Sequence, residues 1–213
     1  MDGLIIRNEN EKDHNEVEML IREAFWNLNV PGCDEHYLAH ILREHEDFIP
    51  ELDLTAVLDG RIIGSIMYTK AWLTDENGID KEIISFGPIA VHPDFQRQGV
   101  GKTLIERSFD IAVQMGYEAV VIFGHPGNYV SRGFKSCRKF NICLEGDICP
   151  TAMLAKELKE DALDGKKYFF RGSSAFEYDS SEAEKFDSRF PQKEKEYLPC
   201  QEEFYIYSHS VIN

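Results

Sequence analysis

The sequence predicts an α/β protein of the α+β kind, with a mixed, mostly antiparallel sheet of about seven strands flanked by helices. Residues 83–115 read as a strand, a glycine-containing turn and an amphipathic helix. Residues 54–58 and 61–69 read as strands joined by Asp59-Gly60, a strong hairpin signal. Residues 117–123 form a short apolar run, typical of a buried strand parallel to the one before the helix.

Composition sets broad bounds on the protein. The 213 residues suffice for one well-buried domain with an appendage. A formal charge of -15 argues against a nucleic-acid or membrane-surface partner and slightly favours cationic ligands. Residues 1–7 show no basic-then-apolar pattern and the sequence has no run of 18 apolar residues, so we expect a cytoplasmic protein. The five cysteines include no C-x-x-C pair, which favours reduced thiols and no metal site.

The N-terminal part predicts one strand and two helices. Residues 4–7 are apolar enough for a strand, and apolar residues recur at helical spacing over 17–25. A second helix is expected from Asp34 to about residue 45. His36 and His40 lie four residues apart in it, but they lack the H-E-x-x-H pattern, so we interpret them as surface histidines rather than zinc ligands.

The strand expected over residues 83–91 contains an interruption at Gly87-Pro88. Proline cannot donate to a strand ladder and glycine often marks a bulge, so this dipeptide predicts a bulge. The alternative is that it ends one strand and starts another. Residues 70–81 are expected to form a polar connection before this strand.

Glycines at the start of the following helix predict a phosphate or pyrophosphate site. Gly99 and Gly101 let the backbone approach a ligand, and the N–H groups of the first helical turn lack internal partners. A nucleotide-triphosphate loop would need glycine at position 96, where the chain has Gln96. A dinucleotide fingerprint would need glycine at position 104, where it has Leu104.

The residues Gln96-x-x-Gly99-x-Gly101 match the [QR]-x-x-G-x-[GA] signature, here after a strand ending Ile-Ala-Val-His-Pro. In this setting the chain resembles the GNAT N-acetyltransferase superfamily, and a branch of small bacterial predicted N-acetyltransferases within it. The resemblance covers about residues 4–163 and is specific over 83–134. It implies the GNAT acyl-CoA N-acyltransferase fold, with the sheet splayed between strands 4 and 5.

The resemblance also implies how acetyl-CoA binds. The backbone amides of residues 98–103 would hold the pyrophosphate, and the strand before the turn would bind the pantetheine arm. Asn128 departs from the usual N-x-x-A spacing before the family's tyrosine. The cofactor-binding residues expected on this basis are Ile89, Ala90, Val91, Gln96, Arg97, Gln98, Gly99, Val100, Gly101, Lys102, Thr103 and Asn128.

Catalytic residues are expected after the buried strand. Tyr129 with Gly133-Phe134 resembles the family's Y-x-x-x-G-F element, which implies that Tyr129 is the general acid for the CoA thiolate. Alternatively its ring packs under the loop. His125 is the first candidate for the general base, followed by Glu82 and Ser85. A turn histidine bonded to local backbone is the alternative for His125.

The remaining sequence predicts strands over 138–144 and 153–158, which complete a domain of residues 1–165. Residues 166–213 form an extension with an expected helix over 180–189 and an expected strand over 203–207. Its aromatic content argues against a disordered tail. We expect it to dock on the core or on a partner chain, and a homodimer is left open.

The sequence thus predicts an acetyl-CoA-dependent N-acetyltransferase, with no metal. The acetyl group would pass to a primary amine by direct attack in a ternary complex. The acidic composition slightly favours a cationic small molecule as the acceptor. The alternative is a CoA-binding regulatory or interaction module without significant turnover.

Overall fold

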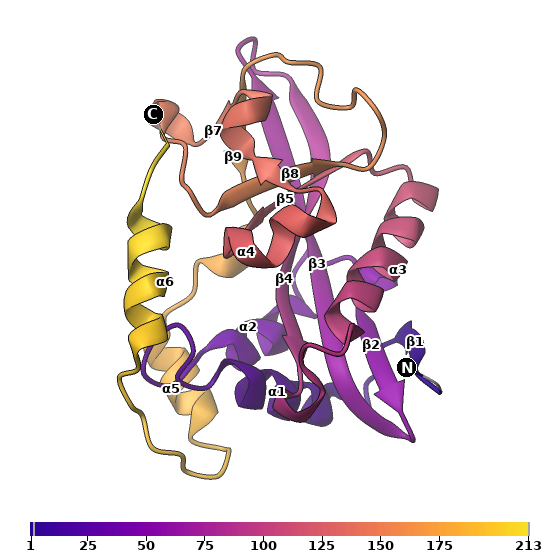
Figure 1. Cartoon of the computed structure of the whole chain (residues 1–213), viewed down its shortest axis with the longest axis vertical. Helices are drawn as coiled ribbons and strands as arrows, with labels where there is room; N and C mark the ends of the chain where they lie inside the picture. The colour runs from indigo at the N-terminus through magenta and orange to yellow at the C-terminus, as the bar shows by residue number, and fades with distance from the viewer. Residues whose placement is uncertain (2, 213) are drawn as a thin grey trace.

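The computed structural model describes residues 1 and 3–212. A mixed sheet runs through it in the order β1-β2-β3-β4-β5-β8-β6, with β9 on β3 and β7 on β9 (Figure 1). Most neighbours are antiparallel, whereas β4 and β5 are parallel, as are β7 and β9. The predicted fold class is confirmed. The strands are β1 Ile5–Asn8, β2 Leu54–Leu58, β3 Arg61–Asp75, β4 Asp80–Val91, β5 Ala119–Phe123, β6 Lys135–Ser136, β7 Ile142–Cys143, β8 Met153–Glu157 and β9 Tyr168–Arg171.

Helices pack on the two faces of this sheet (Figure 1). Helix α1 packs on β3 and β4, and α3 packs on β2 and β3. Along β3, Met67 belongs to the apolar cluster under α1 and α2, whereas Ile66 and Tyr68 belong to the cluster under α3. The helices are α1 His14–Phe25, α2 Glu35–Leu42, α3 Val100–Gln114, α4 Pro126–Tyr129, α5 Ser180–Asp187 and α6 Pro199–His209. In the described chain, none of them combines the length and apolar character that crossing a bilayer requires.

Strand β4 carries the predicted bulge. Ile89 pairs with Ile66 of β3, but Phe86 pairs with Tyr68, so Gly87 and Pro88 together lie opposite a single β3 residue. The strand continues through the dipeptide, so the alternative of two separate strands is wrong. Strand β4 pairs with β5 at Ile84, opposite Val120. In the described chain this register does not extend to the bulge, so the two strands part there.

Two segments between β3 and β8 differ from the sequence prediction. Residues 70–81 are not a polar connection, because β3 and β4 extend into a hairpin there. The side chain of Asp75 holds the turn of this hairpin by accepting hydrogen bonds from the N–H groups of Asn77 and Ile79. Ala71 and Leu73 are buried there, which explains why the strand continues. Only residues 142–143 of the strand expected over 138–144 form, because residues 137–140 make a 3₁₀ turn.

The expectation that every cysteine is reduced is wrong for one pair. Cys143 and Cys149 form a disulfide, with Cα atoms 4.6 Å apart. The turn at Glu145–Asp147 reverses the chain between them. Cys33, Cys137 and Cys200 are free thiols. A spacing of six residues carries no disulfide signal by itself, so the pairing depends on this turn.

The C-terminal segment packs on the preceding residues. Strand β9 pairs with β3, with Trp72 opposite Arg171, and α5 lies against α2. The expected helix over 180–189 is confirmed as α5. The expected strand over 203–207 is wrong: these residues belong to α6, which starts at Pro199, a residue that suits the first helical position. The division of the chain at residue 165 stays a prediction.

Candidate active site

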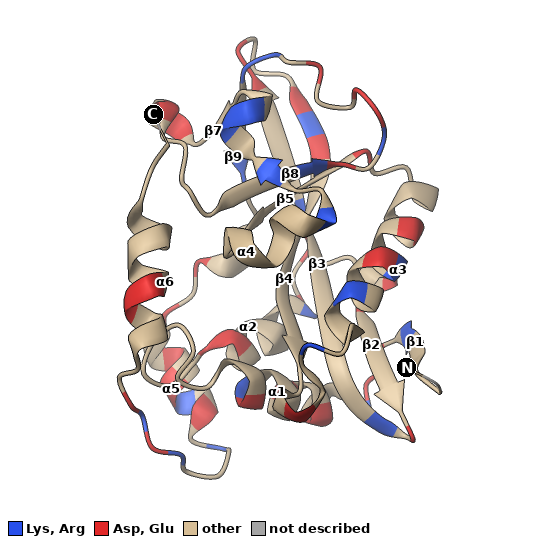
Figure 2. Ribbon diagram, viewed as in Figure 1, with Lys and Arg blue, Asp and Glu red and all other residues tan. Residues whose placement is uncertain are grey.

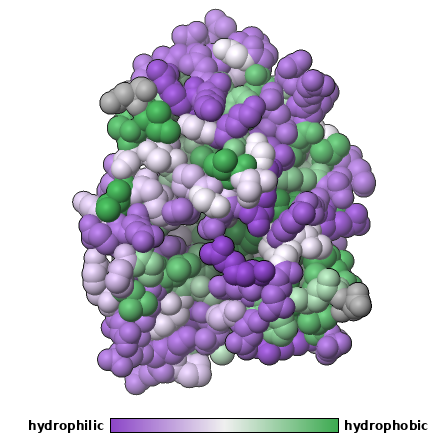
Figure 3. All heavy atoms as spheres, in the orientation of Figure 1, coloured by the Kyte–Doolittle hydropathy of each residue, from purple (hydrophilic) through white to green (hydrophobic). Residues whose placement is uncertain are grey.

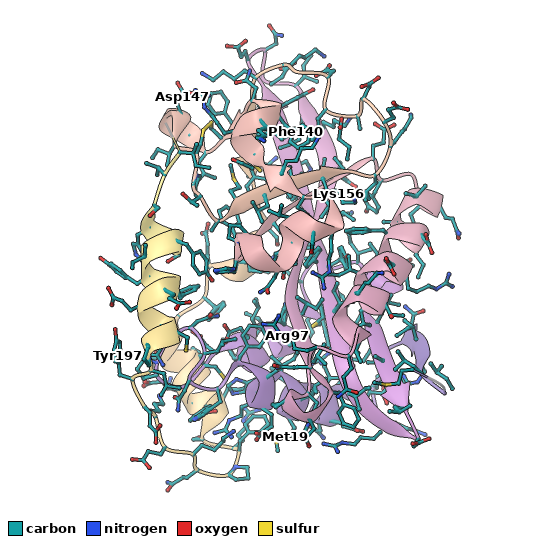
Figure 4. The ribbon with its side chains drawn as sticks, in the orientation of Figure 1. Met19, Arg97, Phe140, Asp147, Lys156 and Tyr197 are labelled. Carbon is teal, nitrogen blue, oxygen red and sulfur yellow. A yellow bond between two sulfur atoms is a disulfide. The ribbon has the colours of Figure 1, made fainter. Side chains whose placement is uncertain are left out.

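A cavity of about 530 Å³ lies where the end of β4, the glycine turn, the start of α3 and helix α4 meet. We call it the cofactor cavity. Its walls bring together nine of the twelve residues predicted to bind the cofactor. In Figure 4, Arg97 lies near the middle of this face, between α4 and α1. These nine residues are Ile89, Val91, Gln96, Arg97, Gly99, Val100, Gly101, Lys102 and Asn128.

The other three predicted residues do not line this cavity. The side chain of Ala90 packs in the cluster under α1, on the opposite face of the sheet from α3. Gln98 donates from Nε2 to the carbonyl of Asp94, at 2.9 Å. Thr103 donates from Oγ1 to the carbonyl of Gly99, at 3.2 Å. The last two side chains hold the turn and the first helical turn together.

The turn before α3 contains two residues with left-handed backbone conformation. Arg97 and Gly99 have left-handed φ values of 60° and 92°, and glycine adopts this conformation without steric cost. Gln96 Nε2 donates to the carbonyl of Val91 at 3.1 Å, which ties the turn to the end of β4. The N–H of Thr103 bonds the carbonyl of Gly99 at 3.0 Å. The N–H groups just before Thr103 have no partner within the helix and are available to an anion.

A neighbouring cavity of about 550 Å³ continues the cofactor cavity along α3. The two share Lys102, Ile105, Ser131 and Arg132, and Lys156 lines only the second. Lys156 lies on β8 (Figure 4) and donates to the carbonyl of Arg132 at 2.9 Å. Figure 2 shows basic residues at the start of α3, after α4 and on β8, in the same part of the molecule. These side chains concentrate positive charge locally in an acidic protein.

Tyr129 lies at the end of α4 and lines the cofactor cavity. Its ring packs against Phe86 and Phe134, with centroids 5.8 and 5.6 Å away. A Cβ at Gly124 would lie 2.5 Å from Tyr129 Cε2, so the glycine leaves room for this ring. Burial raises the pKa of Tyr129 to about 12, so its phenol keeps its proton at neutral pH.

His125 is the N-cap of α4. Its Nδ1 accepts from the N–H of Gly127 at 3.0 Å, and its ring lies edge-on to Tyr207 at 4.8 Å. A neutral imidazole that accepts at one nitrogen carries its proton on the other. In this tautomer His125 has no free nitrogen lone pair to take a proton from a substrate. The lesser base candidates, Glu82 and Ser85, do not line any of the cavities described here.

A third cavity of about 400 Å³ lies between the α1–α2 loop, the β4 bulge, the end of β5 and helix α6. We call it the acceptor-side cavity. It shares Leu28, Ile89, Asn128 and Tyr129 with the cofactor cavity, so the two spaces meet at these residues. Figure 3 shows hydrophobic residues inside the hollow in the middle of this face, with hydrophilic residues around it. The apolar walls are Phe25, Leu28, Leu38, Phe86, Pro88, Ile89, Phe123, Ala152 and Phe204.

Two features of the acceptor-side cavity were not predicted from the sequence. Glu35, the first residue of α2, lines it, and its Oε1 accepts from Asn29 Nδ2 at 3.1 Å. In the sequence Glu35 has the pattern of an ordinary acid in a first helical turn. Phe204 and Tyr207 line the cavity from α6. Their i, i+3 spacing places them on one side of a helix, but we expected a strand there.

Comparison with known proteins fits this geometry. The crystal structure of the GNAT N-acetyltransferase YhbS of Escherichia coli, in complex with CoA, superposes with a TM-score of 0.71. The sequences are 26% identical, and the match covers 82% of this chain and 92% of that one. A GNAT acetyltransferase of Brucella melitensis shares the fold, with a TM-score of 0.65, 22% identity and coverage of 81% and 97%. The fold is therefore that of an N-acetyltransferase.

The sequence model of the acetyltransferase (GNAT) family matches residues 18–136, and the chain belongs to this family. The uncharacterised N-acetyltransferase YhbS of Escherichia coli K12 is 29% identical over 163 residues, which is 76% of this chain and 92% of that protein. The uncharacterised N-acetyltransferase YjhQ of the same strain is 34% identical over 97 residues, 45% of this chain and 52% of that protein. The resemblance predicted from the glycine turn is confirmed.

Proposed function

We propose that this protein transfers an acetyl group from acetyl-CoA to a primary amine by direct attack within a ternary complex. The observation that carries the proposal is the meeting of two cavities at Leu28, Ile89, Asn128 and Tyr129. One cavity has the glycine turn with its free N–H groups, and the other is mostly apolar and adjoins the first at these residues. Two substrates that occupy them can meet at the shared residues, as direct transfer requires.

The residues of the cofactor cavity fit CoA. The free N–H groups at the start of α3 can donate hydrogen bonds to a pyrophosphate, and Lys102, Arg132 and Lys156 can neutralise further phosphate charge. Ile89 and Val91 follow the bulge, where β4 has left β5, so their backbone groups can bond the pantetheine arm. The relative YhbS was crystallised with CoA, which supports the same ligand here.

Acetyl-CoA supplies an acetyl group on a thioester. The β4 backbone N–H groups near the bulge are available to stabilise negative charge on the thioester oxygen during attack. Tyr129 donates its phenolic proton to the departing thiolate. Its high pKa holds the proton until the sulfur gains charge, and its position provides most of the catalytic effect.

A CoA-binding module without turnover is the competing function. Such a module would need only the cofactor cavity. The acceptor-side cavity is a second space that also reaches Tyr129, which favours an enzyme.

Calorimetric titration with acetyl-CoA and a thiol-release assay across amines test the proposal. Tyr129→Phe should lower kcat by about 100-fold while the Kd of acetyl-CoA stays within a factor of two, because a general acid acts mainly in the transition state. Tyr205→Phe is the matched control, since Tyr205 is exposed on α6. Full activity of Tyr129→Phe would remove the tyrosine from the mechanism. Failure of the wild-type protein to bind acetyl-CoA would refute the proposed function.

A further inference from the structure

We propose that Glu35 binds the ammonium group of the acceptor and takes its proton, and that the acceptor is a primary amine on a compact apolar body. This inference rests on the proposed function and assigns the acceptor side of the same site. It follows from three observations: the lining of the acceptor-side cavity, the environment of Glu35, and the hydrogen bond that occupies His125.

The acceptor-side cavity suits an apolar body with one positive charge. Its walls are mostly aromatic and aliphatic, and Glu35 is the one carboxylate among the described residues that line it. Within the part of the chain that the structure describes, no lysine and no arginine lines this cavity. An acceptor with its own carboxylate would find no cation there, and a polyamine would bring charges that a single carboxylate cannot match. An arylalkyl or alkyl amine fits both the walls and the charge.

Helix α6 supplies the far wall of this cavity. Phe204 and Tyr207 lie one helical turn apart, with ring centroids 5.4 Å from each other, and both rings line the cavity. Aromatic walls of this kind bind a flat or branched apolar group well. Figure 1 shows α6 running along one edge of the molecule, beside α4 and α5. The acceptor's body would therefore contact the C-terminal segment.

Glu35 is placed to receive a proton. Asn29 occupies one of its carboxylate oxygens, and within residues 1 and 3–212 no basic side chain forms a salt bridge with it. Burial, with a smaller effect of the charge on Asp34, raises the pKa of Glu35 to about 7. A base works best when its pKa lies near the working pH. Other titratable groups surround Glu35. Cys33 and Asp34 lie beside it, Tyr178 approaches from the C-terminal segment, and Asp187 of α5 contacts the neighbouring His36. Across the cavity lie His125, Tyr129 and Tyr207.

The reaction balances with these groups. The Glu35 carboxylate takes one proton from the ammonium, and the free amine attacks the thioester carbon. The C–N bond forms and the C–S bond breaks with its electron pair on sulfur, which takes the proton of Tyr129. The second proton that nitrogen loses restores the Tyr129 phenol, and Glu35 releases its proton to solvent. The products are an N-acetyl amide, CoA thiol and one proton.

The test compares amines and variants on the full chain. Thiol release is measured with 2-phenylethylamine, spermidine and glycine as acceptors. We expect kcat/KM for 2-phenylethylamine to be at least about tenfold higher than for the other two, because of the apolar walls. Glu35→Gln should lower kcat/KM for 2-phenylethylamine about 100-fold without changing the Kd of acetyl-CoA. Glu44→Gln is the matched control, because Glu44 is an exposed acid just after α2.

The pH profile separates a base from a structural residue. A carboxyl whose pKa is raised to about 7 is protonated below that pH, so the wild-type kcat/KM should rise as pH passes through 7. Glu35→Gln should lose this rise, and Glu44→Gln should keep it. The neutral analogue 2-phenylethanol should inhibit the wild type and Glu35→Gln with constants within about twofold, because it has no charge for Glu35 to bind.

The outcomes are distinct. A Glu35→Gln variant with the wild-type rate and pH profile would overturn the role of Glu35. The wild type could bind acetyl-CoA and yet fail to acetylate 2-phenylethylamine, whether it acetylates spermidine, glycine or no amine at all. That result would overturn the acceptor class while leaving CoA binding intact. Absence of acetyl-CoA binding in the wild type would refute the proposed function, and this inference with it.

Discussion

Gly124→Ala should misplace Tyr129 without altering any group that takes part in the reaction. Gly124 follows β5, and a Cβ added there would lie 2.5 Å from Cε2 of the Tyr129 ring and 3.2 Å from Cδ2. Ordinary contacts of a Cβ atom begin at 3.4 Å. The Tyr129 ring must therefore be displaced by about 1 Å. It cannot avoid the new methyl group by rotation alone, because the neighbouring rings of Phe86 and Phe134 limit its rotation.

This displacement gives an expected magnitude. A 1 Å misplacement of a catalytic group can cost about 100-fold in rate, so kcat should fall by about that factor. Inserting a methyl group into packed surroundings should also lower the free energy of unfolding by about 1–3 kcal/mol. The Kd of acetyl-CoA should change little, because the turn at Gly99 and Gly101 is separate from Gly124.

The assay is steady-state thiol release at saturating acetyl-CoA, with urea unfolding of the same preparations. Gly172→Ala is the control: a Cβ there would lie 3.4 Å from Phe170, an ordinary contact with another aromatic ring. The double variant Gly124→Ala/Tyr129→Ala should have the unfolding free energy of Tyr129→Ala alone, because the added methyl then meets no ring. A Gly124→Ala enzyme with kcat within twofold of the wild type would refute the idea that this ring must be held in place.

Two predictions concern stability. Asp53 is buried beside Glu9 and Arg43, and burial raises the pKa of the Asp53 and Glu9 carboxyls. The folded chain therefore keeps a proton that the unfolded chain loses above about pH 4. The free energy of unfolding should fall as pH rises toward neutral. Asp53→Asn should flatten that fall in urea titrations, and an unchanged slope would contradict it. Arg22 is only 1% exposed, and its Nε lies 2.6 Å from the carboxylate of Asp187. Asp187→Ala leaves this buried charge without its partner, so the free energy of unfolding in urea should fall by about 3–5 kcal/mol. Proteolysis of the C-terminal segment should also become faster. A loss below about 1 kcal/mol would show that the pair does not anchor α5.

Several features could be read from the sequence because they depend on neighbouring residues. The Asp59-Gly60 hairpin, the amphipathic helices α1 and α3, and the glycine turn between Gln96 and Gly101 are local patterns. The bulge at Gly87-Pro88 follows from the two residue types that weaken a strand ladder. These same features build the cofactor cavity, so most of its residues were predicted by position.

The tertiary structure decided the rest, because the deciding contacts join residues far apart in the chain. Residues 203–207 alternate like a strand, but Gln201 bonds the carbonyl of Asn27 and α6 packs as a helix across the acceptor-side cavity. The Cys143–Cys149 pairing needed the turn between them. Glu35 has no distinguishing mark in the sequence, and only the fold brings it to a cavity with Tyr129 and Phe204. The sequence by itself determined the family and the cofactor cavity, and packing over long sequence distances decided the acceptor side.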